Sequence, residues 1–178
     1  MREVIFALLL LFAPLLEAGN KWNVQLPGGG MHFYGELIAQ ACSVETSDKN
    51  LTVNMGQLRT NMLTAPGQET APVLFDIHLR ECSKTASEYV SITFLGIADS
   101  TNPDIFAIGD GPNSASGIGL AVFDSANTLI PINSAPRKMA RIINGDMTLH
   151  FVAKYRATSY QVTGGKANAQ ALFSLTYE

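Results

Sequence analysis

Two cysteines, Cys42 and Cys82, are the only thiols in the 178-residue chain. They do not form the Cys-x-x-Cys pair of a redox centre, and no His/Cys cluster surrounds them. An apolar segment at the start of the chain predicts export, and an even number of cysteines in an oxidising compartment indicates a disulfide. We therefore predict a Cys42–Cys82 bond, which would stabilise the fold by on the order of 4 kcal/mol through the loop it closes.

Other residues that could do chemistry do not form a recognisable site. His32, His78 and His150 fall in separate segments without the spacing that metal ligands need. The short glycine pairs at 109–111 and 117–119 lack the third glycine and the following helix of a phosphate-binding loop, so they are better interpreted as turns. No Gly-x-Ser-x-Gly motif is present either. We predict no catalytic, cofactor or metal site, and a protein that is not an enzyme.

The charge pattern argues against nucleic acid as a partner. The chain has 12 Lys and Arg against 15 Asp and Glu, for a net charge of −3. The basic residues are scattered and form no stripe of the kind that phosphate binding requires. We expect neither nucleic acid nor a small-molecule substrate.

The first 18 residues have the composition of a secretory signal peptide. Arg2 precedes an apolar run over residues 4–16, and small residues follow at Ala18 and Gly19. A membrane-spanning helix needs about 20 apolar residues, and Pro14 interrupts this shorter run. We predict cleavage after Ala18, with cleavage one residue later as the alternative.

The rest of the chain has the period of strands rather than helices. Val73, Phe75, Ile77 and Leu79 alternate with polar residues, as in a sheet with one buried face. Short strands separated by Gly, Pro, Asn and Asp turns predict a single all-β domain, a β-sandwich of immunoglobulin type. The predicted strands are 31–38, 42–45, 51–58, 73–81, 89–97, 116–123, 127–132, 147–157 and 167–177.

The last predicted strand offers the best clue to function. Its small and apolar residues fall on one face by the two-residue period, and mostly polar residues fall on the other. One interpretation is a strand that pairs fully within its own sheet, and another is an edge that a partner must cover. The residues of the apolar face are Ala167, Ala169, Ala171, Phe173, Leu175 and Tyr177.

Six motifs, in order along the chain after the signal peptide, resemble those of chaperone–usher fimbrial subunits, the pilins. Within that family the chain is most similar to minor subunits of type 1 fimbriae. The motifs are Phe33-Tyr-Gly35-Glu-Leu37 with Ala41-Cys42-Ser-Val44, Phe75-Asp-Ile-His-Leu-Arg-Glu-Cys82, Phe94-Leu-Gly96, Gly117-Ile-Gly-Leu120, Phe151-Val-Ala-Lys-Tyr-Arg-Ala-Thr158 and Gly165-Lys-Ala-Asn-Ala-Gln-Ala-Leu-Phe-Ser-Leu-Thr-Tyr177.

This resemblance implies an incomplete immunoglobulin-like sandwich that lacks its last strand and is completed by a donor strand. A periplasmic pilus chaperone would supply that strand first, and the N-terminal extension of a neighbouring pilin would replace it at the outer-membrane usher. The exported subunit would end in a fimbrium at the cell surface. The resemblance implies a donor strand with Met31, Phe33, Gly35 and Leu37 on one face, and an acceptor groove and chaperone-recognition end at Ala169, Ala171, Phe173, Leu175, Tyr177 and Glu178.

On the residues alone, 31–38 could equally be the first strand of the chain's own sandwich. With the resemblance, we expect an extension over 19–38 and a pilin domain over 39–178. Residues 19–30 add Trp22 and three consecutive glycines before the donor pattern, either as further donor contacts or as a flexible leader. Such an extension favours a minor subunit, one that ends or anchors the fibre; a major rod subunit or a fimbrial adhesin are the alternatives.

Overall fold

The computed structural model describes residues 30–32, 34 and 41–178. The chain divides into two compact units, Met1–Leu37 and Ile38–Glu178, and only the second contains regular structure among the described residues. The predicted signal peptide and the donor-face residues Phe33, Gly35 and Leu37 lie outside the described residues. Met31 is described, and its side chain is exposed. Within the described part of the chain, no helix has the length and apolarity to cross a membrane.

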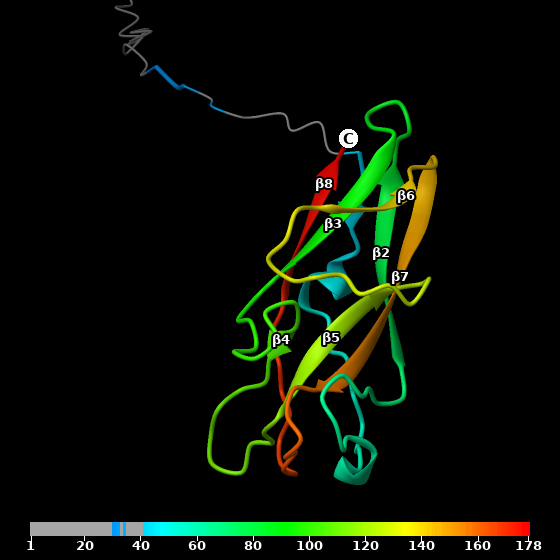
Figure 1. The fold of residues 1–178 in the computed structure, drawn as a ribbon. Coiled ribbons are helices and arrows are strands. Elements are labelled where there is room, and N and C mark those ends of the chain that lie inside the picture. The colour runs from blue at the N-terminus through cyan, green and yellow to red at the C-terminus, as the bar shows by residue number, and fades with distance from the viewer. Residues whose placement is uncertain (1–29, 33, 35–40) are drawn as a thin grey trace, which may run out of the picture. The chain divides into compact units, whose positions relative to one another are not determined.

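The Ile38–Glu178 unit is built from strands in two sheets (Figure 1). One sheet has the order β1-β2-β7-β5-β4, and the other has the order β6-β3-β8. Every pairing between these strands is antiparallel, as in an immunoglobulin-like sandwich. The elements are β1 (Ser43–Val44), the 3-10 turns η2 (Thr46–Asn50) and η3 (Thr60–Met62), β2 (Val73–Cys82), β3 (Tyr89–Leu95), β4 (Phe106–Ala107), β5 (Ile118–Asp124), β6 (Arg137–Arg141), β7 (Gly145–Ala157) and β8 (Leu172–Tyr177).

The all-β prediction is confirmed, with differences at individual strands. Residues 51–58 and 127–132 are not strands; the second of these contributes only isolated contacts to β5, such as the bond from Ile130 N to Val122 O at 2.9 Å. The strand β6 was not predicted, because its charged residues hide the alternation. The predicted strand 167–177 begins only at Leu172, since the preceding residues bond to the 109–115 loop; Gly109 N donates to Asn168 O at 2.7 Å.

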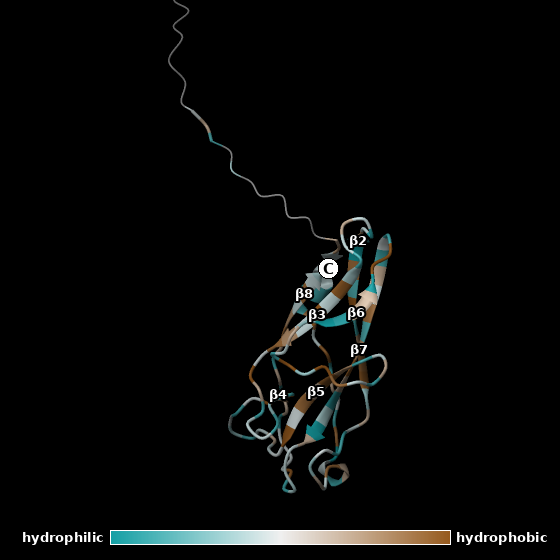
Figure 2. Cartoon of the chain, turned by 45° about the horizontal axis from the view of Figure 1, so that its top comes forward, coloured by the Kyte–Doolittle hydropathy of each residue, from teal (hydrophilic) through white to brown (hydrophobic). Residues whose placement is uncertain are grey.

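The core lies between the two sheets and is formed by alternate residues of their strands. Figure 2 shows apolar and polar positions alternating along these strands. Phe151 of β7 is at its centre, stacked on Phe75 at 5.3 Å and edge-on to Phe94 of β3 at 5.4 Å between ring centroids. This packing joins the two sheets, because Phe94 belongs to one and Phe151 to the other.

The predicted disulfide is confirmed. Cys42, which directly precedes β1, is bonded to Cys82 at the end of β2, and both residues are buried in the main core. The bond therefore fixes the point where the chain enters the sandwich.

Candidate functional site

The strand β8 has an unpaired edge. It lies at the end of its sheet and pairs only with β3 among the described strands. Tyr89 and Glu178 exchange two backbone hydrogen bonds, each 3.0 Å long. Because bonded pairs alternate along an antiparallel ladder, the N–H and C=O groups of Phe173, Leu175 and Tyr177 point away from β3. Such a row of free backbone groups is a template for another strand.

The same three residues turn their side chains toward the core. Phe173, Leu175 and Tyr177 pack against the main hydrophobic cluster but stay only partly buried, whereas Ser174 and Thr176 between them are exposed. Backbone groups that are free to pair and apolar side chains that are incompletely covered thus occur at the same positions. A strand laid along this edge would satisfy both.

The remaining predicted acceptor residues lie outside β8 and differ in burial. Ala169 is partly buried against the main cluster, although it precedes β8. Ala171 is exposed and also precedes the strand. Glu178 lies directly after β8, and its backbone oxygen accepts hydrogen bonds from the N–H groups of Glu88 and Tyr89.

Two tyrosine hydroxyls anchor this stretch to the other sheet. Tyr177 donates to the carbonyl oxygen of Cys42 at 3.0 Å, and Tyr155 of β7 donates to the carbonyl oxygen of Ala167. Burial raises the pKa of both phenols, so both stay protonated and able to donate. Nothing in the sequence pattern indicated either bond, because each joins residues through folding rather than through a motif.

Residues 51–58 form a second stretch without a strand partner. In the described chain, none of their backbone groups bonds to another backbone group. Val53 and Met55 are partly buried, and Met55 packs on the same small cluster as Ala167, which leads into β8. Sequence reasoning expected an ordinary strand here and did not identify the segment as a candidate binding edge.

Histidine and carboxylate pairs occur away from this edge. His78 Nδ1 lies 2.8 Å from Asp48, and His150 Nδ1 lies 2.8 Å from Asp76. Among the described residues, no three or more His, Cys, Asp and Glu side chains gather in a way that could hold a metal ion. The first pair fastens η2 to β2, and the second joins β2 to β7 within the larger sheet.

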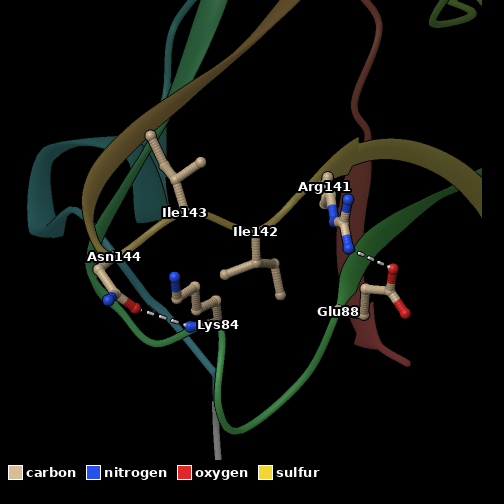
Figure 3. Close-up of a pocket in the computed structure, with 6 residues that line it drawn as sticks. All are labelled: Lys84, Glu88, Arg141, Ile142, Ile143 and Asn144. Atoms are coloured by element: carbon tan, nitrogen blue, oxygen red, sulfur yellow. Dashed lines mark hydrogen bonds and ion pairs between the residues drawn. The ribbon is translucent and has the colours of Figure 1, made fainter.

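One pocket lies at the end of the sandwich where β8 finishes (Figure 3). It is formed by the β2–β3 turn and the β6–β7 connection. Its lining residues are Lys84, Glu88, Arg141, Ile142, Ile143 and Asn144.

Comparison with known proteins identifies similar chains. Residues 31–178 match the family model described as fimbrial protein. The fimbrial subunit type 1 of Salmonella typhimurium is 36% identical over 175 residues, covering 97% of this chain and 95% of the relative. The putative fimbrin-like protein FimI of Salmonella typhi is 38% identical over 172 residues, covering 95% and 94%.

Solved structures of fimbrial proteins are similar to this chain in fold. The Burkholderia pseudomallei antigen and type I fimbria protein is 36% identical with a TM-score of 0.61, covering 78% of this chain and 90% of that chain. The P pilus rod subunit PapA has a TM-score of 0.67 at 24% identity, covering 78% of this chain and 100% of that one.

Proposed function

The chain belongs to the fimbrial protein family and is a subunit of a chaperone–usher fimbria, and we propose that it assembles by strand exchange through the edge of β8. Its neighbours in the fibre are other pilins. The periplasmic chaperone would supply the first strand, and the extension of a neighbouring pilin would replace it at the outer-membrane usher. Export through the periplasm to the cell surface belongs to the same proposal.

The observation that carries this proposal is the coincidence of free backbone groups and incompletely covered side chains at Phe173, Leu175 and Tyr177. A donor strand would add backbone hydrogen bonds worth about 0.5–1.5 kcal/mol each and would cover apolar surface at about 25 cal/mol per Å². The donor face in this proposal is Met31, Phe33, Gly35 and Leu37 of the extension. The acceptor is the face of β8 together with Ala169, Ala171 and the chaperone-recognition residue Glu178.

The geometry of the Ile38–Glu178 unit also supports one direction for the proposed donor strand. The carbonyl of Ala41 accepts a bond from Ser83 N at 2.7 Å, and Tyr177 contacts Cys42, so the chain enters at the pole toward which β8 runs. In a fibre of equally oriented copies, an extension leaving this pole enters the next copy from the opposite pole. It would therefore run antiparallel to β8, as the missing strand of an immunoglobulin-like sandwich does.

Residues 51–58 would form the other wall of the acceptor. Their backbone groups have no backbone partner in the described chain, and Val53 and Met55 offer partly buried apolar side chains. A donor strand between 51–58 and β8 would pair on both sides. A donor strand would thus supply the backbone partners that residues 51–58 lack within the described subunit.

A peptide-exchange experiment tests the proposal. The chain is purified with its chaperone and mixed with a peptide of residues 30–40, and the subunit–peptide complex is measured over time. We expect Phe33→Ser in the peptide to slow exchange about tenfold or more, because Phe33 is on the proposed inward face. Tyr34→Ser, on the outward face, is the matched control. Equal rates for the two peptides, or no exchange with the natural peptide, would contradict the proposal.

We further propose that this is a minor subunit that ends or anchors the fibre, rather than a major rod subunit. The support is the added sequence at 19–30, with Trp22 and three glycines before the donor pattern. The test compares the purified chain with a type 1 rod subunit after release from chaperone, by electron microscopy. We expect short oligomers from this chain and long rods from the control, and long rods from both would rule out the minor role.

A further inference from the structure

Hydrogen bonds join the two walls of the pocket in Figure 3. Lys84 N donates to Asn144 Oδ1 at 3.0 Å, and Ile142 N donates to Glu88 O at 2.8 Å. The side chains of Arg141 and Glu88 form an ion pair at 2.9 Å. The cavity volume is about 540 Å³, which is ample for one large side chain.

The lining combines an apolar centre with a cationic rim. Ile142 is buried beneath the pocket, while the neighbouring Ile143 is 55% exposed. No carboxylate of the described residues lies within 4.0 Å of Lys84 Nζ, whereas Arg141 is paired with Glu88. An exposed isoleucine beside an ammonium group suits a ligand with an apolar body and a polar tip, such as a tyrosine side chain.

The position of the pocket indicates where that side chain comes from. The pocket is at the pole where the chain enters the sandwich, because one of its walls is the β2–β3 turn, whose Ser83 bonds to Ala41. If the subunits assemble head to tail, as the proposed function states, this pole faces the opposite pole of the next subunit. The turns at the opposite pole (Figure 1) expose two large apolar side chains, Tyr160 at 78% and Met62 at 58%.

We propose that the pocket centred on Ile143 is a second contact between consecutive copies of this chain in the short oligomers expected above, and receives Tyr160 of the neighbouring copy. The aromatic ring covers Ile143, and the phenol oxygen accepts a hydrogen bond from Lys84. This contact rests on the proposed head-to-tail assembly but uses none of the groups that bind the donor strand. It restricts the angle between subunits, which the extension alone leaves free.

Disulfide trapping tests the contact. The only two cysteines of the chain are bonded to each other, so introduced cysteines are the only free thiols. The double variant Ile143→Cys with Tyr160→Cys is allowed to form strand-exchange complexes, is oxidised and is run on a non-reducing gel. Residues 143 and 160 are at opposite poles, so any new disulfide must join two subunits. We expect covalent dimers and higher oligomers in most of the exchanged material.

Matched controls separate this inference from the proposed function. Leu74→Cys with Tyr160→Cys places the first thiol on an exposed residue along β2, 76% exposed, and should cross-link at most a tenth as much. Exchange complexes that form without cross-links between residues 143 and 160 would overturn this inference and leave the proposed function standing. The inference would also fail if Ile143→Cys cross-linked more strongly to Met62→Cys than to Tyr160→Cys. If the unsubstituted chain exchanged neither with its own copies nor with the peptide of residues 30–40, the proposed function would fail and the inference with it. Exchange with the peptide but not with its own copies would overturn the inference alone.

Discussion

The hydroxyl of Tyr177 donates a hydrogen bond to the carbonyl oxygen of Cys42, 3.0 Å away and 135 residues earlier in the chain. This bond joins the end of β8, in the smaller sheet, to the disulfide-bonded start of the larger sheet. It therefore closes one end of the sandwich beside the edge that we propose receives a donor strand. The phenol does this without blocking the backbone groups of Tyr177, which point away from β3.

Removing only this hydroxyl should weaken the subunit modestly. We expect Tyr177→Phe to lower the free energy of unfolding by about 1 kcal/mol, because the Cys42 carbonyl loses its donor. The measurement is urea unfolding of the subunit saturated with donor peptide. Thr176→Val, a change of similar size at the adjacent outward position, should have an effect within about 0.5 kcal/mol. A larger effect at Thr176 than at Tyr177 would show that the bond is not a structural link.

The two faces of β8 should differ sharply in their tolerance of charge. Leu175 packs on the main core, whereas Thr176 is exposed. We expect Leu175→Asp to reduce periplasmic accumulation at least tenfold when the chaperone is co-produced, because an unpaired carboxylate would be buried when a strand is added. Thr176→Asp should accumulate normally, as measured by immunoblotting of periplasmic extracts. Similar yields for both variants would contradict the acceptor role of this face.

Deleting residues 173–178 should be more severe than either substitution. The deletion removes the free edge of β8 and the Tyr177 anchor together. We expect no periplasmic accumulation, because the chaperone has no strand to pair with and the core is left open. A truncated protein that stayed soluble and monomeric without the chaperone, as judged by analytical ultracentrifugation, would disprove the open-edge model.

The disulfide should matter most before the donor strand is in place. It closes a loop across 40 residues of sequence separation, and its removal should cost on the order of 4 kcal/mol. We expect the Cys42→Ser, Cys82→Ser variant to unfold at lower urea concentration than the unsubstituted chain, and to accumulate poorly in the periplasm. The unsubstituted chain measured in reducing agent should reproduce the variant's midpoint. Unchanged unfolding in both cases would mean that the bond adds nothing to the native fold.

How much could be predicted from the sequence depended on whether a feature was local. The alternation in β2 and β8 predicted the inward faces, because a strand's period is a property of its own residues. Residues 51–58 have similar alternation but no strand pairing in the described chain, because pairing depends on which segments the fold brings alongside a strand. The bonds of Tyr155 and Tyr177 to backbone carbonyls, and the pocket at Ile143, each join segments that only the fold brings together. The donor positions Phe33, Gly35 and Leu37 still rest on the sequence alone.

Acid should destabilise the Ile38–Glu178 unit through Asp48. The pKa of this buried carboxyl is held below its ordinary value, first by the backbone N–H of His78, which donates at 2.6 Å, and also by the His78 ring. Because the folded-state pKa is the lower one, the resulting stability is fully present above the unfolded pKa of about 3.9 and is lost as pH falls through the folded value. We expect Asp48→Asn to cost about 1.5–3 kcal/mol at pH 7 and clearly less near pH 3, in urea titrations at both pH values. Asp76→Asn is the matched control, since Asp76 also contacts a histidine ring but is half-exposed, and its replacement should cost at most about 1 kcal/mol. A loss at Asp48 that is the same at both pH values would show that its charge does not support the fold.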